Sequence, residues 1–77
     1  MVEAYILIQT EVGKADSVVR EIASIDGVTS ADPVTGPYDA VVRAQAEDVD
    51  ALGKLVVAQI QAAVGITRTL TCPIITL

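Results

Sequence analysis

The fold is decided by residues 34–46, VTGPYDAVVRAQA, in which a turn is followed directly by an alternating strand pattern. Gly36 permits a backbone conformation that other residues avoid, and Pro37 fixes φ. Asp39 has a side chain that can bond nearby backbone amides. The five residues 35–39 are therefore the strongest turn signal in the chain.

Strand patterns lie on both sides of this turn, over residues 28–34 and 38–46. Pro33 stands near the end of the first of them. Because proline cannot donate to a strand ladder, that end is expected at a sheet edge or at the entry to a turn. The two segments predict a β-hairpin.

A helical pattern flanks the hairpin on each side. Residues 14–25 carry an apolar stripe with helical spacing and stop at Asp26-Gly27. Residues 49–63 carry a second stripe, preceded by Asp48 as a good N-cap. Gly53 lies inside the second helix at a cost of about 1 kcal/mol relative to Ala, which we interpret as a position of close packing.

The outer segments have strand patterns. Residues 2–11 are apolar on both faces near their middle. In residues 66–76, alternation predicts one face with threonines and the other with apolar side chains, while Pro73 limits pairing beyond it. The expected faces are Thr67, Thr69 and Thr71 on one side, and Ile66, Leu70 and Cys72 on the other.

The resulting order, βαββαβ, predicts an α+β fold of the ferredoxin-like type. Right-handed crossovers place both helices on one face of a four-stranded antiparallel sheet. The other face is then uncovered, although it carries apolar residues. An exposed apolar sheet face usually marks an interface, so we expect a homodimer in which two sheets pack face to face, a dimeric α+β barrel.

Composition restricts the function. The 77 residues form one domain, 1–77, with 52% hydrophobic and only 3% aromatic residues. The net charge is −5, and no two of the five basic residues are adjacent, so direct nucleic-acid binding is not expected. We see no secretory signal and no apolar run long enough for a membrane span, which favours a cytoplasmic protein.

The sequence has few of the side chains that enzymes use in catalysis. Histidine is absent, so the usual nucleophile–base pairs are missing, and there is no glycine-rich phosphate loop. Glu47, Asp48 and Asp50 form the densest acidic group, which we interpret as a helix N-terminus rather than a metal site. Cys72 is interpreted as a packed thiol. We therefore expect no enzyme, no catalytic residue, no metal and no cofactor.

Two segments could bind a small polar ligand. In the turn Thr35–Asp39, free amides could hold a carboxylate while the Asp39 side chain accepts from an ammonium group. The hydroxyls of the threonine row could line a pocket at a subunit junction. Both segments also have purely structural interpretations, as a hairpin turn and as half-exposed strand residues.

The chain resembles the effector-binding and oligomerisation (RAM) domain of the Lrp/AsnC regulators over its whole length. The resemblance rests mainly on the hairpin, residues 34–42, VTGPYDAVV. Further support comes from Val12-Gly13-Lys14, from Ile25-Asp26-Gly27-Val28, and from residues 64–69, VGITRT. Full-length regulators carry a helix-turn-helix domain before this domain, so the chain is similar to the stand-alone members, which cannot read DNA.

The resemblance implies a homodimer, assembly of dimers into rings such as octamers, and an amino-acid effector bound at junctions between dimers. It also implies full-length Lrp/AsnC regulators as partners. The implied ligand-binding residues are Gly36, Tyr38 and Asp39 in the loop, with neighbouring Thr35, and Thr67 and Thr69 in the last strand. Pro37 departs from the polar or acidic residue that many members carry.

Three other functions stay open. The chain could be an assembly module without a ligand, or an ACT-like amino-acid-binding regulatory domain with the same βαββαβ order. A dimeric α+β barrel enzyme is the third, but such enzymes typically use His, Trp or Asn, which are absent here.

Overall fold

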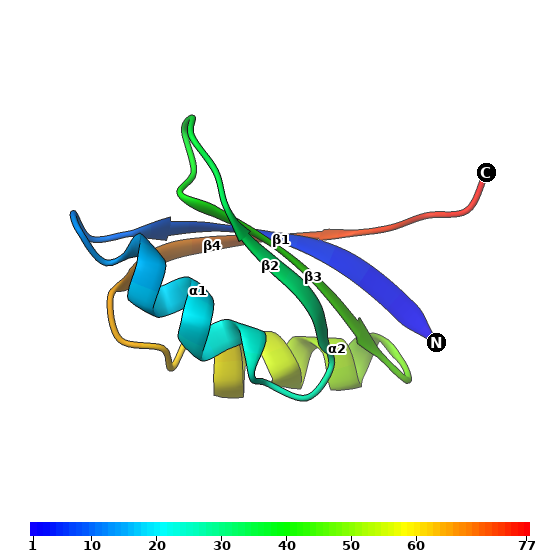
Figure 1. The fold of residues 1–77 in the computed structure, drawn as a ribbon. Coiled ribbons are helices and arrows are strands. Elements are labelled where there is room, and N and C mark those ends of the chain that lie inside the picture. The colour runs from blue at the N-terminus through cyan, green and yellow to red at the C-terminus, as the bar shows by residue number, and fades with distance from the viewer.

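The computed structural model describes all 77 residues and confirms the βαββαβ order. A short π-helical segment, η1, directly continues the second helix. The elements, shown in Figure 1, are β1 (Val2–Thr10), α1 (Ala15–Ala23), β2 (Val28–Pro33), β3 (Ala40–Ala46), α2 (Val49–Leu55), η1 (Val56–Ile60) and β4 (Ile66–Pro73).

The four strands form one antiparallel sheet in the order β2-β3-β1-β4. Both helices lie on the same face of this sheet, as the sequence predicted (Figure 1). The opposite face carries no element of the chain, and we call it the open face. Pro33 ends β2, which is an edge strand as expected. None of the helices has the length and the apolar character of a membrane span.

The core lies between the sheet and the helices. Alternate residues of the central strands face the helices, with Ile6 of β1 opposite Val42 of β3, and both are fully buried. Burying a side chain of this size contributes about 1.5–3 kcal/mol. The helices supply Val18, Ile22, Leu52, Leu55, Val56 and Ile60. Strand alternation directs the intervening residues, such as Tyr5 and Val41, to the open face.

The second helix begins as predicted but ends differently. Asp48 Oδ1 accepts a 2.7 Å hydrogen bond from Ala51 N, which confirms the N-cap. The sequence predicted a continuous helix over 49–63, whereas the α-helix ends at Leu55 and a π-helical turn follows. The wider turn keeps both Val56 and Ile60 against the core.

The prediction that Gly53 is a position of close packing is wrong within the chain. A Cβ built at Gly53 would have no neighbouring atom within 4 Å. The reason is that α2 buries its opposite side, through Leu52 and Leu55, so Gly53 faces outward.

The predicted faces of the last strand need a correction at its start. Thr10 pairs with Ile66 and Gln9 pairs with Arg68, so Thr67 is an extra residue in a bulge. Ile66 consequently packs against the core instead of sharing a face with Leu70.

The remainder of β4 alternates regularly. Thr69 and Thr71 pair with Ile8 and Ile6, on the helix side. Cys72 pairs with Tyr5 on the open face and is exposed, so the expected packing of its thiol within the chain is wrong.

Candidate functional site

The predicted site residues all lie at one end of the sheet, where β1 ends and the hairpin turns. Ile8 of β1 pairs with Ala40 on one side and with Thr69 on the other. The turn before Ala40 and the start of β4 therefore flank the same part of β1. We call this the hairpin end, and the opposite end, which holds both chain termini, the terminal end.

Asp39 fixes the hairpin to the central strand. Its Oδ2 accepts a 2.8 Å hydrogen bond from Thr10 N, and its own backbone N–H donates to Ile8 O at 2.8 Å. Its carbonyl oxygen accepts from Val34 N at 2.9 Å, which closes the hairpin. The second carboxylate oxygen, Oδ1, has no hydrogen-bond partner in the chain and is the one available for another group.

The tip of the hairpin rises from the sheet on the open-face side (Figure 1). Thr35, Gly36 and Pro37 are exposed, whereas Tyr38 is half-buried. Gly36 has φ +140° with no atom within 4 Å of a built Cβ. Gln9 Nε2 donates a 3.0 Å hydrogen bond to Pro37 O, which joins the hairpin tip to β1. Sequence analysis missed Gln9, because no local pattern connects it to a residue 28 positions away.

The threonines of β4 are less well placed for the same site. Thr69 Oγ1 accepts a 2.7 Å hydrogen bond from Gln61 Nε2, on the helix side of the sheet. The hairpin tip stands on the other side, so the structure does not bring the Thr69 hydroxyl to the tip within one chain. Thr67 lies exposed in the bulge at the hairpin end.

Arg68 is a second residue that sequence analysis did not select. It is exposed, pairs with Gln9 in the sheet register, and forms no ion pair. It therefore provides a positive charge without an ion-pair partner on β4, and β1 lies between β4 and the two hairpin strands. A free guanidinium suits a carboxylate, which it can bind with two parallel hydrogen bonds.

A charged cluster lies on the open face nearer the terminal end. Arg43 Nη2 is 2.6 Å from Glu3 Oε2, and Arg43 Nη1 donates to Tyr5 Oη at 3.1 Å. The guanidinium carbon lies 5.4 Å from the centroid of the Tyr5 ring. The hydrogen bond from Arg43 to Glu3, followed by their charge attraction, raises the pKa of Arg43 above its ordinary value. The Arg43 guanidinium, which is charged at neutral pH like any arginine, therefore contacts both the Glu3 carboxylate and the Tyr5 ring.

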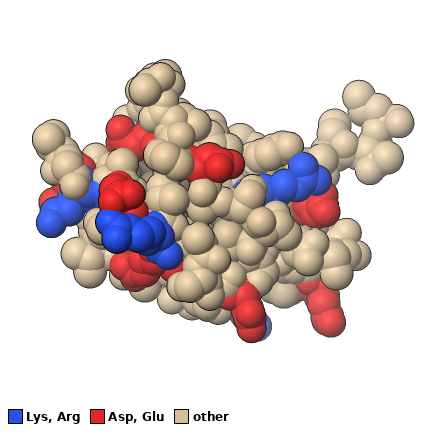
Figure 2. Space-filling view, viewed as in Figure 1, with Lys and Arg blue, Asp and Glu red and all other residues tan.

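Basic and acidic side chains are interspersed on the face of the molecule that Figure 2 shows. Figure 2 shows Lys and Arg separated by acidic and uncharged residues on the face in view, without a continuous basic patch. No group of three or more His, Cys, Asp or Glu residues is arranged to hold a metal ion. The predicted site therefore offers hydrogen-bonding groups and single charged side chains, and not a cluster of like charges.

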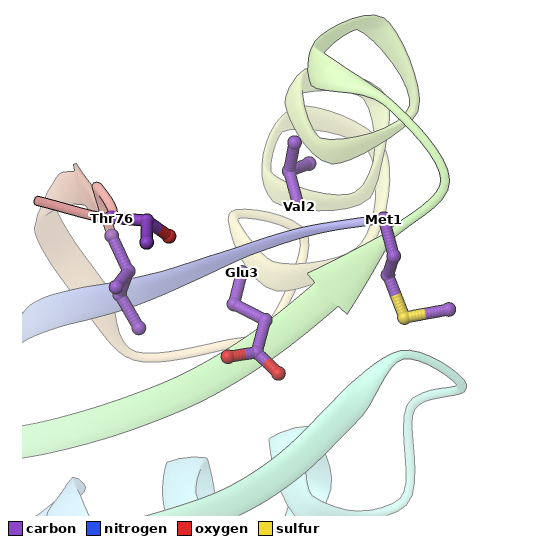
Figure 3. A pocket seen from close by; sticks show the side chains of 5 residues that line it. Met1, Val2, Glu3 and Thr76 are labelled. Atoms are coloured by element: carbon purple, nitrogen blue, oxygen red, sulfur yellow. The ribbon is translucent and has the colours of Figure 1, made fainter.

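Both surface hollows lie at the terminal end. The first, of about 350 Å³, is lined by Met1, Val2, Glu3, Ile74 and Thr76 (Figure 3). The second, of about 340 Å³, lies beside α2 and is lined by Asp26, Gln45, Ala46, Glu47, Ala51, Lys54, Leu55, Ala58 and Gln59. Neither contains a predicted site residue, so the two hollows of the single chain lie away from the hairpin end.

Comparison with known families gives one match. Residues 3–76 match the model of the Lrp/AsnC ligand binding domain. No curated protein matched the chain.

Solved structures with the same fold include several of similar length. A protein from Thermus thermophilus is 30% identical with a TM-score of 0.93, and the match covers 100% of this chain and 96% of that one. AsnC from E. coli is 26% identical with a TM-score of 0.91, and the match covers 99% of this chain but 52% of AsnC. The chain thus spans about half the length of AsnC.

A more distant match shares the fold. The transcriptional regulator NMB0573 from Neisseria meningitidis, solved as a complex with L-Met, is 17% identical with a TM-score of 0.86. That match covers 97% of this chain and 50% of the regulator.

Proposed function

Because this chain belongs to the Lrp/AsnC ligand binding domain family, we propose that it senses a small-molecule effector, with amino acids as the effector class. The observation that carries the proposal is the position of Asp39. One carboxylate oxygen is used to fix the hairpin to β1, and the other has no partner within the chain. A charged acceptor held in a fixed position is what recognition of an ammonium group requires.

The groups around Asp39 could complete the recognition of a zwitterion. At the exposed tip, Thr35 and Gly36 offer backbone N–H groups, and Arg68 offers a guanidinium without an ion-pair partner in the chain. Either can bind an α-carboxylate while Asp39 binds the α-ammonium. The regulator NMB0573, which shares this fold, was solved with L-Met, so the fold is compatible with an amino-acid ligand.

The pocket is proposed to form between subunits. No hollow of the single chain includes the predicted residues. The open face carries Tyr5 and Leu70, each about two-fifths exposed, together with Leu7 and Val41. Two copies that pack these faces together would form the dimeric α+β barrel, and the raised hairpin tips would border the contact.

The regulatory output is proposed to pass through assembly. The face shown in Figure 2 has no continuous basic patch, and the domain matches about half of AsnC, a full-length relative. In this proposal the domain acts by entering oligomers of full-length Lrp/AsnC regulators. A pull-down of such regulators with the purified chain tests this step, and failure to recover heteromers at micromolar concentrations would contradict it.

Effector binding is tested by thermal shift against the twenty amino acids. A ligand at 100 times its Kd stabilises the folded state by about 2.7 kcal/mol, which raises the melting temperature of so small a domain by several degrees. Asp39→Asn keeps an oxygen that can accept from Thr10 N but removes the charge, so it should lose the shift while staying folded. Asp32→Asn, an exposed acidic residue of the edge strand, is the matched control and should keep it.

A second function is favoured by the same structure. The Thr69 hydroxyl is already bonded within the chain, and the hairpin end has no hollow of its own. Both facts suit an assembly module without a ligand. The absence of a shift with every amino acid at millimolar concentration, in a protein that still dimerises, would favour this second function over sensing.

A further inference from the structure

Two charged side chains lie on the central strands of the open face. β1 and β3 carry one charged residue each, Glu3 and Arg43, and strand alternation directs both to the open face. Figure 3 shows Glu3 on the opposite side of β1 from Val2. The other charged residues of this face, Asp32 and Arg68, belong to the edge strands β2 and β4. A molecule that covers the open face must therefore cover Glu3 and Arg43.

These two charges are already paired within the chain. Arg43 Nη2 lies 2.6 Å from Glu3 Oε2, and Arg43 Nη1 donates a 3.1 Å hydrogen bond to Tyr5 Oη. The side chains of Arg43 and Glu3 are 41% and 40% exposed, about half the exposure of the Arg20–Asp16 pair on α1, at 76% and 81%. The open face thus presents a neutralised pair, which needs no opposite charge from another molecule.

Covering the open face changes the energetics of this pair. In the single chain the pair is half exposed, and such a pair contributes little to stability. In a contact between two sheets, water is removed from both charges. If one of the two is missing, the other is buried without a partner, which is strongly destabilising. The contact therefore tolerates the complete pair, or two uncharged residues, but not a single charge.

We propose that Glu3 and Arg43 determine which partner chains the open face accepts. The proposal rests on the sheet-packed contact of the proposed function and specifies the class of partner. Accepted partners carry a matched acid–base pair, or no charge, at the corresponding positions of their two central strands. A chain with only one of these charges is rejected, because that charge would be buried without compensation. Accepted partners include a second copy of this chain and full-length regulators that meet the same condition.

The first test measures the dissociation constant of the homodimer by sedimentation equilibrium. Glu3→Met and Arg43→Met should each raise it at least a hundredfold, equivalent to about 2.8 kcal/mol. The double variant, which buries no charge, should return to within tenfold of wild type. Circular dichroism checks that each variant folds. Asp16→Met, which breaks the exposed pair on α1, is the matched control and should leave the dissociation constant unchanged.

The second test measures partner selection directly. Tagged wild-type chain is mixed with each untagged variant at the same concentration, and the captured variant is quantified. Wild type should capture the double variant, and also a variant with exchanged charges, Glu3→Arg together with Arg43→Glu. It should capture neither single variant. Capture of a single variant as efficiently as wild type would overturn the proposal, and so would loss of the double variant.

The outcomes separate this inference from the function on which it rests. A wild-type chain that stays monomeric would contradict the sheet-packed contact itself, and the selection of partners with it. A wild-type dimer whose dissociation constant is unchanged by Glu3→Met and by Arg43→Met would contradict only the selection. Effector binding is a separate measurement, because the thermal shift with amino acids is proposed to depend on Asp39, at the hairpin end.

Discussion

The backbone N–H of Thr10 donates a 2.8 Å hydrogen bond to Oδ2 of Asp39, which joins the last residue of β1 to the end of the hairpin turn. With the bonds from Asp39 N to Ile8 O and from Val34 N to Asp39 O, this one residue ties three segments together. Asp39 is therefore a structural residue as well as the proposed effector contact, and these two functions have to be separated by experiment.

Asp39→Ala should lower the free energy of unfolding by about 1.5–3 kcal/mol, since a hydrogen bond to a charged acceptor is lost and Thr10 N is left unpaired. Asp39→Asn should lose clearly less, because its amide oxygen can accept from the same N–H. Urea unfolding of both variants measures the difference. Equal losses would show that the charge, and not the hydrogen bond, holds the hairpin.

Asp48→Ala should destabilise the protein by about 1 kcal/mol, because the side chain caps α2 by accepting from Ala51 N. Asp48→Asn should be nearly neutral, because Asn is an equally good cap. Glu47→Ala, one position earlier and exposed, serves as the control and should also be close to neutral. Chemical denaturation checks all three. A neutral Asp48→Ala would mean that α2 is held by its packing alone.

Gly65→Ala should be more harmful than Gly13→Ala. Both glycines have a positive φ, of +104° and +79°, so alanine is strained at either position by about 1 kcal/mol or more. At Gly65 the new Cβ would also lie 2.9 Å from Cβ of Lys14, whereas nothing lies within 4 Å at Gly13. Thermal unfolding should therefore show the lower melting temperature for Gly65→Ala, and the reverse order would contradict the geometry of the turn before β4.

Leu70→Glu should weaken the proposed sheet-packed dimer while leaving the fold intact. Leu70 is 42% exposed on the open face, so the change removes no core contact but introduces a charge into the interface. Analytical ultracentrifugation should show a shift from dimer to monomer by at least tenfold in dissociation constant, equivalent to about 1.4 kcal/mol. Val12→Glu, at a fully exposed position of the turn after β1, should leave the dimer unchanged.

The fold could be predicted because its signals are local. The turn at 35–39, the cap at Asp48 and the alternation in β1 each depend on residues close in sequence, and each has the expected structure. The predictions were wrong where strand pairing, and not the local sequence, decides which face of the sheet a side chain occupies. Ile66 changed face because the ladder slips between Gln9 and Thr10, and a slip of one residue reverses every side chain before it.

The candidate binding residues lie near one another, but the contacts they make could not be predicted from the sequence. The residues selected from the sequence do gather at the hairpin end. Sequence could not show that Asp39 is bonded to a backbone amide 29 residues away, or that Thr69 faces the helix side. Gly53 is a similar case. The sequence suggested close packing at this glycine, but no atom of the chain lies within 4 Å of a Cβ built on it.

The backbone N–H of Ile74 donates to Glu3 O at 2.9 Å, so the two ends of the chain run beside each other. A short flexible peptide could therefore link Leu77 to Met1 without disturbing the sheet. New ends could then be opened at the exposed turn near Val12, which would yield a circularly permuted protein with the same sheet. In such a molecule β1 would become the last segment of the chain to be synthesised. The order in which the strands emerge from the ribosome could thus be changed while their arrangement in the folded sheet is retained.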